Sequence, residues 1–244
     1  MERPIIFSGP MIGALLDGRK TQTRRIIKPQ PPADRIVWIN DHWLWTNGDG
    51  DSGAALVPYT PGDRLWVREA HSLHHAHGQN FKRPADDHGE RWGPWSGLPI
   101  AVSPDKTQVA YYREGFDRSG APKWRPSIHM PRWASRLTLI VTDVRVQRLQ
   151  DISEADAEAE GATSRPGAWR RPDWSMDWSE IGRWSRNMGR KLTQADIALG
   201  SARWAFASFW NDLRGLDAWD ANPWVAALTF TVHRCNIDQV GAGE

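Results

Sequence analysis

The segment RLTLIVTDVRVQRLQ, residues 136–150, carries the clearest β-strand pattern in the chain and constrains the fold more than any other stretch. Apolar residues occupy every second position from Leu137 to Val141 and again from Val144 onward. This alternation is typical of a strand with one buried face. The alternation slips by one residue at positions 142–143, which predicts a bulge or a bend there.

Shorter elements with turn-rich connections flank this strand. The patterns predict about seven short strands and three helices. The other strands are expected at residues 23–28, in a hairpin over 35–46, at 59–69 after the turn Pro61-Gly62-Asp63, at 108–114 and at 222–234. The helices are expected from Ser8 to Gly18, from Ser153 to a stop at Gly161, and from Ser201 to Gly215.

Strands that are adjacent in sequence are joined by turns rather than by helical crossovers. This arrangement favours an α+β fold, a small, mixed and mostly antiparallel β-barrel with flanking helices, over a doubly wound sheet. We expect one domain over residues 1–240, with two long irregular inserts at about 71–105 and 164–200.

Composition narrows the class of protein. No apolar run is long enough to cross a bilayer, and the segment MERPIIFSG does not resemble a signal peptide, so we expect a cytoplasmic protein. The single cysteine, Cys235, excludes an intramolecular disulfide and a cysteine-based zinc site. Net charge is only +2, which argues against a polycation that coats nucleic acid. Sixteen tryptophans imply an unusually aromatic core, or a surface that receives flat ligands such as bases.

The segment LDGRKTQTRR concentrates positive charge around two hydroxyl groups, those of Thr21 and Thr23. It follows the predicted first helix, so its cations could simply stabilise the helix C-terminus. Lys20 and Thr23 are three residues apart, which brings both to one side only if the chain makes a helical turn here. An extended segment would instead place them on opposite faces.

Five histidines fall in the first insert, and four of them, His71, His74, His75 and His77, lie within seven residues of one another. Histidine is a common transition-metal ligand, but no carboxylate stands at a recognisable ligand spacing in this loop-like segment. We therefore expect no metal and no other cofactor.

The segments SGPMIGALLDGRKTQTRR, PGDRLWVRE, PSIHMPRWASR and DVRVQRLQDISEADAEAEG together resemble the ASCH family, which belongs to the PUA-like β-barrel superfamily. The resemblance spans about residues 4 to 234 without the two inserts, and the segments are similar to a subgroup of the family that is common in bacteriophages and prophages. The GRKTxTxR core is the specific part, and PGDRLWV alone is weak.

Small bacterial members of this family are amidohydrolases that remove acetyl from N4-acetylcytidine, and the resemblance implies the same site here. It places the catalytic Lys, Thr and Glu on Lys20, Thr23 and Glu160. A threonine hydroxyl needs a base, and a lysine serves as one only when burial or nearby cations lower its pKa. Residues expected to contact the substrate are Arg19, Thr21, Arg24, Arg25, Trp66, Trp124 and His129.

Other readings of the same residues remain open. The basic turn could contact phosphate while a tryptophan-lined pocket holds a single-stranded or modified base of RNA or DNA without chemistry. A nuclease is a weaker alternative, since it requires acidic metal ligands beside the basic turn. Each residue also has an ordinary structural role: Lys20 as a helix cap, Thr23 in a strand pair, and Glu160 at a solvated helix end.

Overall fold

The computed structural model describes residues 1–76, 95, 97–119, 122–162 and 202–240. The chain divides into two compact units. The first comprises Met1–Gly18, Gly62–Val141 and Phe230–Glu244, and the second comprises Arg19–Pro61 and Thr142–Thr229. Strands β10 (Thr138–Arg148) and β11 (Trp224–His233) each continue from one unit into the other along the chain.

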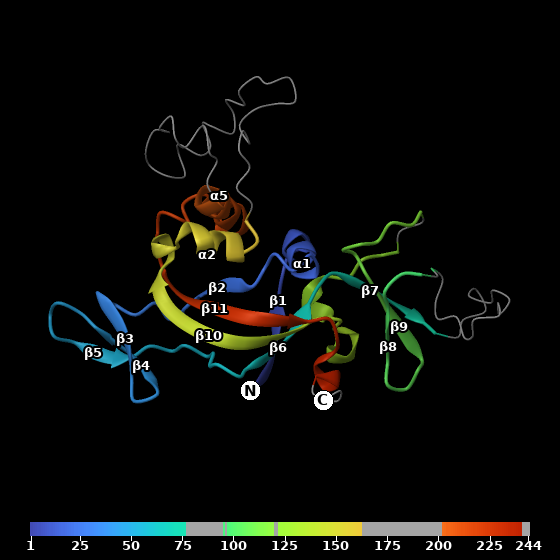
Figure 1. The fold of residues 1–244 in the computed structure, drawn as a ribbon, viewed down its shortest axis with the longest axis horizontal. Helices are drawn as coiled ribbons and strands as arrows, with labels where there is room; N and C mark the ends of the chain where they lie inside the picture. The colour runs from blue at the N-terminus through green and yellow to red at the C-terminus, as the bar shows by residue number, and fades with distance from the viewer. Residues whose placement is uncertain (77–94, 96, 120–121, 163–201, 241–244) are drawn as a thin grey trace, which may run out of the picture. The chain divides into compact units, whose positions relative to one another are not determined.

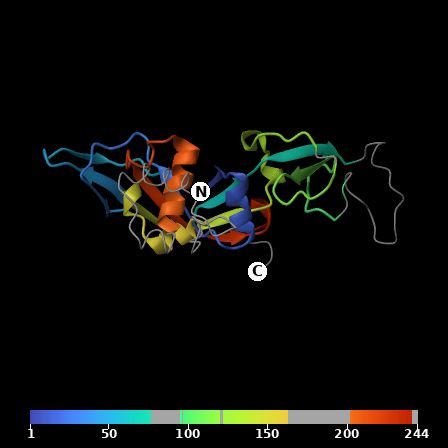
Figure 2. The ribbon, with the colours of Figure 1, turned by 90° about the horizontal axis from the view of Figure 1, so that it is seen from above.

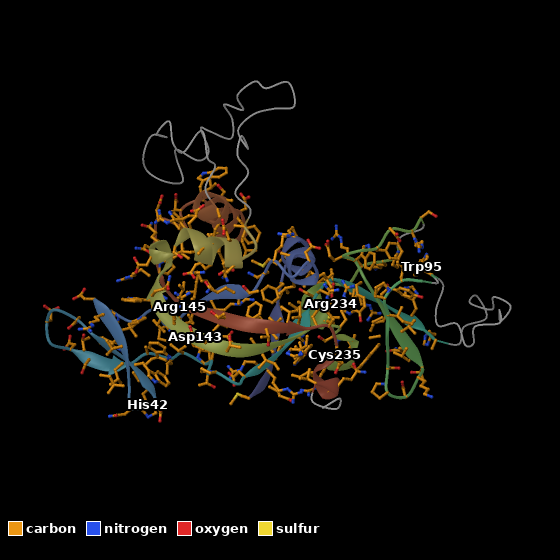
Figure 3. The ribbon with its side chains drawn as sticks, viewed as in Figure 1. His42, Trp95, Asp143, Arg145, Arg234 and Cys235 are labelled. Atoms are coloured by element: carbon orange, nitrogen blue, oxygen red, sulfur yellow. The ribbon has the colours of Figure 1, made fainter. Side chains whose placement is uncertain are left out.

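In the first unit, β1 (Glu2–Ile6) pairs in parallel with β6 (Arg64–Arg68), and β6 pairs antiparallel with the start of β10. Helix α1 (Gly9–Leu16) follows β1. A second, antiparallel sheet has the order β7–β9–β8, formed by His71–His75, Gln108–Tyr112 and Ala101–Val102. Trp95 lies beside this sheet (Figure 3), with its ring 5.0 Å from that of Tyr111. Short 3-10 helices occupy Ser127–His129, Arg132–Ala134 and Ile237–Gln239.

In the second unit, β11 lies between β10 and β2 (Gln22–Ile26) and pairs antiparallel with β2. A separate three-stranded antiparallel sheet contains β3 (Arg35–Ile39), β4 (His42–Thr46) and β5 (Ser52–Ala54). Helices α2 (Glu154–Ala159) and α5 (Ala202–Arg214) lie together over one face of β2 and β11 (Figures 1 and 2). A 3-10 helix, Leu149–Asp151, connects β10 to α2.

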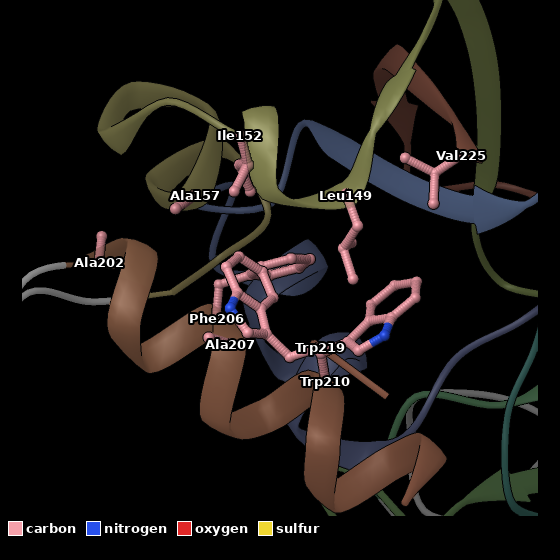
Figure 4. Packing of buried hydrophobic residues seen from close by; sticks show 9 residues of the cluster. All are labelled: Leu149, Ile152, Ala157, Ala202, Phe206, Ala207, Trp210, Trp219 and Val225. Carbon is pink, nitrogen blue, oxygen red and sulfur yellow. The ribbon is translucent and has the colours of Figure 1, made fainter. Parts of the chain in front are cut away.

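A hydrophobic cluster holds α5 and α2 on the sheet of the second unit (Figure 4). Three large rings from α5 and the segment after it, those of Phe206, Trp210 and Trp219, fill its centre, each no more than 3% exposed. They pack against aliphatic side chains that include Leu149 before α2 and Val225 on β11. Because burying an aromatic ring of this size contributes several kcal/mol, on the order of 3–5 when truncation to alanine is the measure, this cluster fixes where α2 lies.

The structure confirms the principal predicted elements and the α+β class. Asn40 and Asp41 both adopt positive φ, the backbone that a two-residue hairpin turn requires. In β10, residues 142 and 143 are both exposed between buried Val141 and Val144, so the predicted slip in alternation is present. At α2, the Ser153 hydroxyl accepts from the Asp156 N–H at 3.1 Å, and Gly161 ends the helix with a φ of 91°.

Other expectations are not confirmed by the described residues or fall outside them. The described strands form three open sheets, mostly antiparallel, and no closed barrel is found among them. The expected irregular insert at 71–105 contains strands near both ends: β7, whose histidines and serine hid the pattern, and β8, whose two residues are too few to show an alternation. The insert at 164–200 lies outside the described residues. No helix in the described ranges is long and apolar enough to cross a membrane.

Candidate active site

The basic segment lies in the second unit, where it leads into β2 instead of continuing the first helix. Gly18, with a φ of 74°, follows α1, and the strand begins at Gln22. The helical turn that would bring Lys20 and Thr23 to one side is therefore not formed. Thr23 pairs with Leu228 of β11 and alternates with its strand neighbours, so its side chain leaves the opposite face of β2 from Gln22 and Arg24.

Lys20 is completely buried, and three acceptors surround its ammonium group. Lys20 Nζ donates to the Gln22 carbonyl at 2.7 Å and to the Glu160 carbonyl at 2.9 Å. Its third hydrogen bond reaches Glu160 Oε2 at 2.6 Å. An ammonium group has three donors, so this set matches its full capacity.

Glu160 terminates α2, and its carboxylate is only 2% exposed. One oxygen binds Lys20, and the other accepts from Arg24 at 3.1 Å. Arg24 is also buried; it donates to Gln22 Oε1 at 2.8 Å and to Asp156 Oδ2 at 3.0 Å. The face of α2 toward β2 therefore presents Asp156 and Glu160, one helical turn apart, to two buried cations.

The network extends outward through Asp156. Its carboxylate also accepts from Gln22 Nε2 at 3.2 Å and from Arg145 of β10 at 2.8 Å. Arg145 and its neighbour Asp143 lie on β10 (Figure 3). The side chain of Arg145 is 43% exposed, so the solvent edge of the network begins there.

Burial and charge act against each other on the ionisable groups. Desolvation by burial lowers the pKa of Lys20, and the charges of Arg25 and Arg24 act in the same direction, whereas Glu160 opposes them. Burial acts to raise the pKa of Asp156, but the hydrogen bond and charge of Arg145 and the charge of Arg24 leave that pKa below its ordinary value. A buried lysine with a lowered pKa beside a carboxylate is an arrangement that occurs at catalytic sites as well as in structural networks.

The remaining predicted residues have varied surroundings. Arg19 and Thr21 are exposed; Arg19 donates to the Gly161 carbonyl at 3.3 Å, and the Thr21 N–H donates to the Ala159 carbonyl at 2.8 Å. Burial lowers the pKa of Arg25, which lies within electrostatic range of Tyr59 and Glu160. Thus the basic segment contacts α2 and its C-terminus through backbone hydrogen bonds and through the exposed Arg19, in addition to its buried side chains.

Three predicted contact residues belong to the first unit. Trp66 of β6 is 7% exposed, and the Arg68 guanidinium lies 4.8 Å from its ring centre. Trp124 packs edge to face against Phe116 with centroids 5.2 Å apart. His129 is exposed at the end of a 3-10 helix. Within that unit, Trp66 and Trp124 have the contacts of packed side chains.

Sequence reasoning missed three members of the network, Gln22, Asp156 and Arg145. Asp156 could have been found, because it precedes Glu160 by four residues and so shares its helix face. Gln22 could have been found from Arg24 by the two-residue period of a strand. Among the described residues, no group of three or more His, Cys, Asp or Glu side chains is placed to hold a metal ion.

Comparison with known proteins adds no assignment. No family model, no curated protein and no solved structure gives a significant match to the chain.

Proposed function

We propose that the protein is an amidohydrolase that deacylates N4-acylated cytosine, as nucleoside or base, with N4-acetylcytidine as the simplest substrate. The observation that carries the proposal is the contact between Lys20 and Glu160, 140 positions apart in sequence and 2.6 Å apart in space. The ASCH resemblance selected these two residues without reference to distance. The PUA-like barrel that the same resemblance implies remains part of the proposal.

The chemistry assigned to the pair is proton transfer. Burial favours the neutral amine, and Glu160 Oε2 is positioned to take the proton that Lys20 gives up. The amine then accepts the proton of the attacking hydroxyl group, assigned to Thr23, while the new C–O bond forms at the acyl carbonyl. The C–N4 bond breaks as that proton passes to the departing amino group, and water afterwards releases the acid from the threonine ester.

Two observations set a requirement on this mechanism. Thr23 leaves the other face of β2, and in the part of the chain that the structure describes its hydroxyl has no hydrogen bond to Lys20 Nζ. Lys20 is also fully buried. Substrate binding must therefore displace at least one acceptor of Lys20 and bring the amine to the hydroxyl group. If it does not, water replaces Thr23 as the nucleophile.

The test is release of cytidine from N4-acetylcytidine and from RNA that contains it, measured by chromatography. Wild type and Lys28→Ala, which removes an exposed lysine of the same charge, should both turn over substrate. Lys20→Ala and Thr23→Ala should each lose at least about a hundredfold in rate, and Thr23→Ser should restore part of it. Activity in Thr23→Ala alone would assign the attack to water, and activity in both alanine variants would reject the proposal.

A second function is favoured by the same two observations. If the buried network only fixes β2 against α2, the exposed Arg19 and its neighbours serve a module that binds a single-stranded or modified base without turnover. Binding of cytosine-containing oligonucleotides that weakens with salt, with no cytidine released, would support this function. A nuclease gains no support from the described residues, among which no acidic metal-ligand cluster occurs.

A further inference from the structure

A pocket in the second unit is lined largely by aromatic side chains and adjoins the outer edge of the Lys20 network, at Arg145. It has a volume of about 260 Å³. The lining residues are Trp38, Trp43, Tyr59, Pro61, Asp143 and Val144. They come from β3, β4, the segment before β6, and β10, so four parts of the chain converge on one cavity.

The two tryptophans form a wedge. Trp38 and Trp43 are cross-strand partners in the β3–β4 hairpin, with ring centroids 5.0 Å apart and planes inclined by 59°. A flat base sandwiched between two rings needs planes close to parallel, whereas a rounded group can contact two inclined faces at once. Trp38 remains 46% exposed although it is large and apolar, so the cavity is open to a ligand.

The charged residue that lines the pocket is Asp143. Asp143 contributes a carboxylate that is 56% exposed. Residues 29–61, which carry the hairpin and both tryptophans, contain four aspartates and one arginine, a net charge of −3. The aspartates are Asp34, Asp41, Asp49 and Asp51, and the arginine is Arg35. Asp34 and Asp51 contact the loop between β4 and β5, at the other end of the hairpin from the two tryptophans. Arg25 lies within electrostatic range of Tyr59. Asp143 is therefore the carboxylate that favours a cation over a phosphate group at the pocket.

Arg145, which forms an ion pair with Asp143, is shared with a second carboxylate. Arg145 Nε is 3.8 Å from Asp143, which is an ion-pair distance, while its NH2 group donates to Asp156 at 2.8 Å. The shorter contact directs the guanidinium toward α2. The carboxylate of Asp143 therefore keeps capacity for a cation in the pocket.

We propose that this pocket binds a quaternary ammonium group, which contacts the faces of Trp38 and Trp43 and is balanced by Asp143. Ring faces attract cations through their quadrupoles, tryptophan most strongly, and methylated ammonium groups are poorly hydrated and suit such cages. Tyr59 supplies a third aromatic wall, and Pro61 and Val144 supply apolar contacts for the methyl groups. Two sources carry this group: a small molecule such as choline, and a trimethylated lysine side chain in a peptide. The inference is independent of the proposed amidohydrolase activity.

The experiment is a titration of the full-length protein followed by NMR of the indole N–H signals, assigned with Trp38→Phe and Trp43→Phe. The probes are choline, a trimethyl-lysine peptide with its unmethylated counterpart, 3,3-dimethylbutanol as the neutral isostere of choline, and cytidine monophosphate as a phosphate-bearing base. Choline should shift the Trp38 and Trp43 signals, and the neutral isostere should bind at least about tenfold more weakly, because it lacks the charge. Tighter binding of the methylated peptide than of choline would identify a peptide as the source, and equal or weaker binding would identify a small molecule.

Variants test the assigned contacts. Trp38→Ala should reduce choline affinity at least about tenfold, and Asp143→Asn should reduce it several-fold. Ile39→Ala is the matched control, since Ile39 is the neighbouring, 47% exposed residue of β3 and its side chain alternates to the other face. Equal affinity for choline and its neutral isostere, preference for cytidine monophosphate, or no shift of either indole at millimolar choline would each overturn the proposal. These comparisons use wild-type protein and stand even where a variant fails to fold.

Discussion

Replacing Lys20 by Met should be among the most destabilising substitutions in the second unit. The change removes three hydrogen bonds and leaves the Gln22 carbonyl, the Glu160 carbonyl and one Glu160 carboxylate oxygen buried without that donor. Breaking a buried ion pair from one side costs about 3–5 kcal/mol. We expect a loss of that size in the free energy of unfolding, measured by urea denaturation.

The partner substitution completes a double-mutant cycle. Glu160→Gln should cost a similar amount, because it removes the carboxylate charge that Lys20 and Arg24 share and leaves Asp156 as a carboxylate partner of Arg24 alone. In the double variant neither orphaned charge remains, so the combined loss should be at least about 2 kcal/mol smaller than the sum of the single losses. Lys28→Met, at an exposed position, should stay within about 0.5 kcal/mol of wild type.

The pH dependence of the same variants has a defined sign. Because burial lowers the pKa of Lys20 from 10.5, the folded chain releases this proton at a lower pH than the unfolded chain does. Between the two pKa values the unfolded state binds more protons, so the stability of wild type relative to Lys20→Met should rise with pH toward 10.5. Additive single losses, or a Lys20→Met cost below about 1 kcal/mol, would refute a tightly coupled buried pair.

Three further predictions concern other parts of the fold. Burial lowers the pKa of His71 from 6.5, so the folded state resists its protonation and Tm should fall as pH drops below 6.5; His71→Asn should flatten this dependence. Gly53→Ala should cost about 1–3 kcal/mol in urea denaturation, because its Cβ would lie 2.9 Å from Trp45 Nε1 across β4 and β5. Trp210→Ala should lower the free energy of unfolding by about 3–5 kcal/mol, since the ring fills the centre of the α5 cluster. It should also weaken the tryptophan bands of the near-UV circular dichroism spectrum.

Elements with a strong apolar period were predictable from the sequence. The alternation from Leu137, its slip at residues 142–143 and the hairpin at Asn40-Asp41 reflect local rules that the structure obeys. Strand β7 was not predictable in this way. His71 and Ser72 are buried, and such residues are read as loop until their partners are known. His71 exchanges backbone hydrogen bonds with Arg125, which is 54 positions farther along the chain.

The sequence predicted which residues of the candidate site lie together better than it predicted their geometry. The resemblance paired Lys20 with Glu160, and the structure places them in contact. Their burial could not be read from the sequence, since lysine and arginine are almost never fully buried unless they are paired. The pairing partners lie more than 130 positions away. The strand predicted from residue 23 begins one residue earlier, at Gln22, and this extended backbone takes the place of the helical turn that would have brought Lys20 and Thr23 together.

The buried charges of the site specify the register of β2. This structural role has to be distinguished from a catalytic one when the proposed functions are tested. In the observed register Lys20, Gln22 and Arg24 face α2, where Asp156 and Glu160 receive their hydrogen bonds. A slip of one residue would turn Thr23 toward α2 and leave both carboxylates without these partners. A network that rejects other registers has a structural reason to exist whether or not it is catalytic. Stability losses in the Lys20 and Glu160 variants therefore report the structural role of the network. Its catalytic role is reported by the rate of acyl-cytosine turnover in the double variant, provided that this variant is folded.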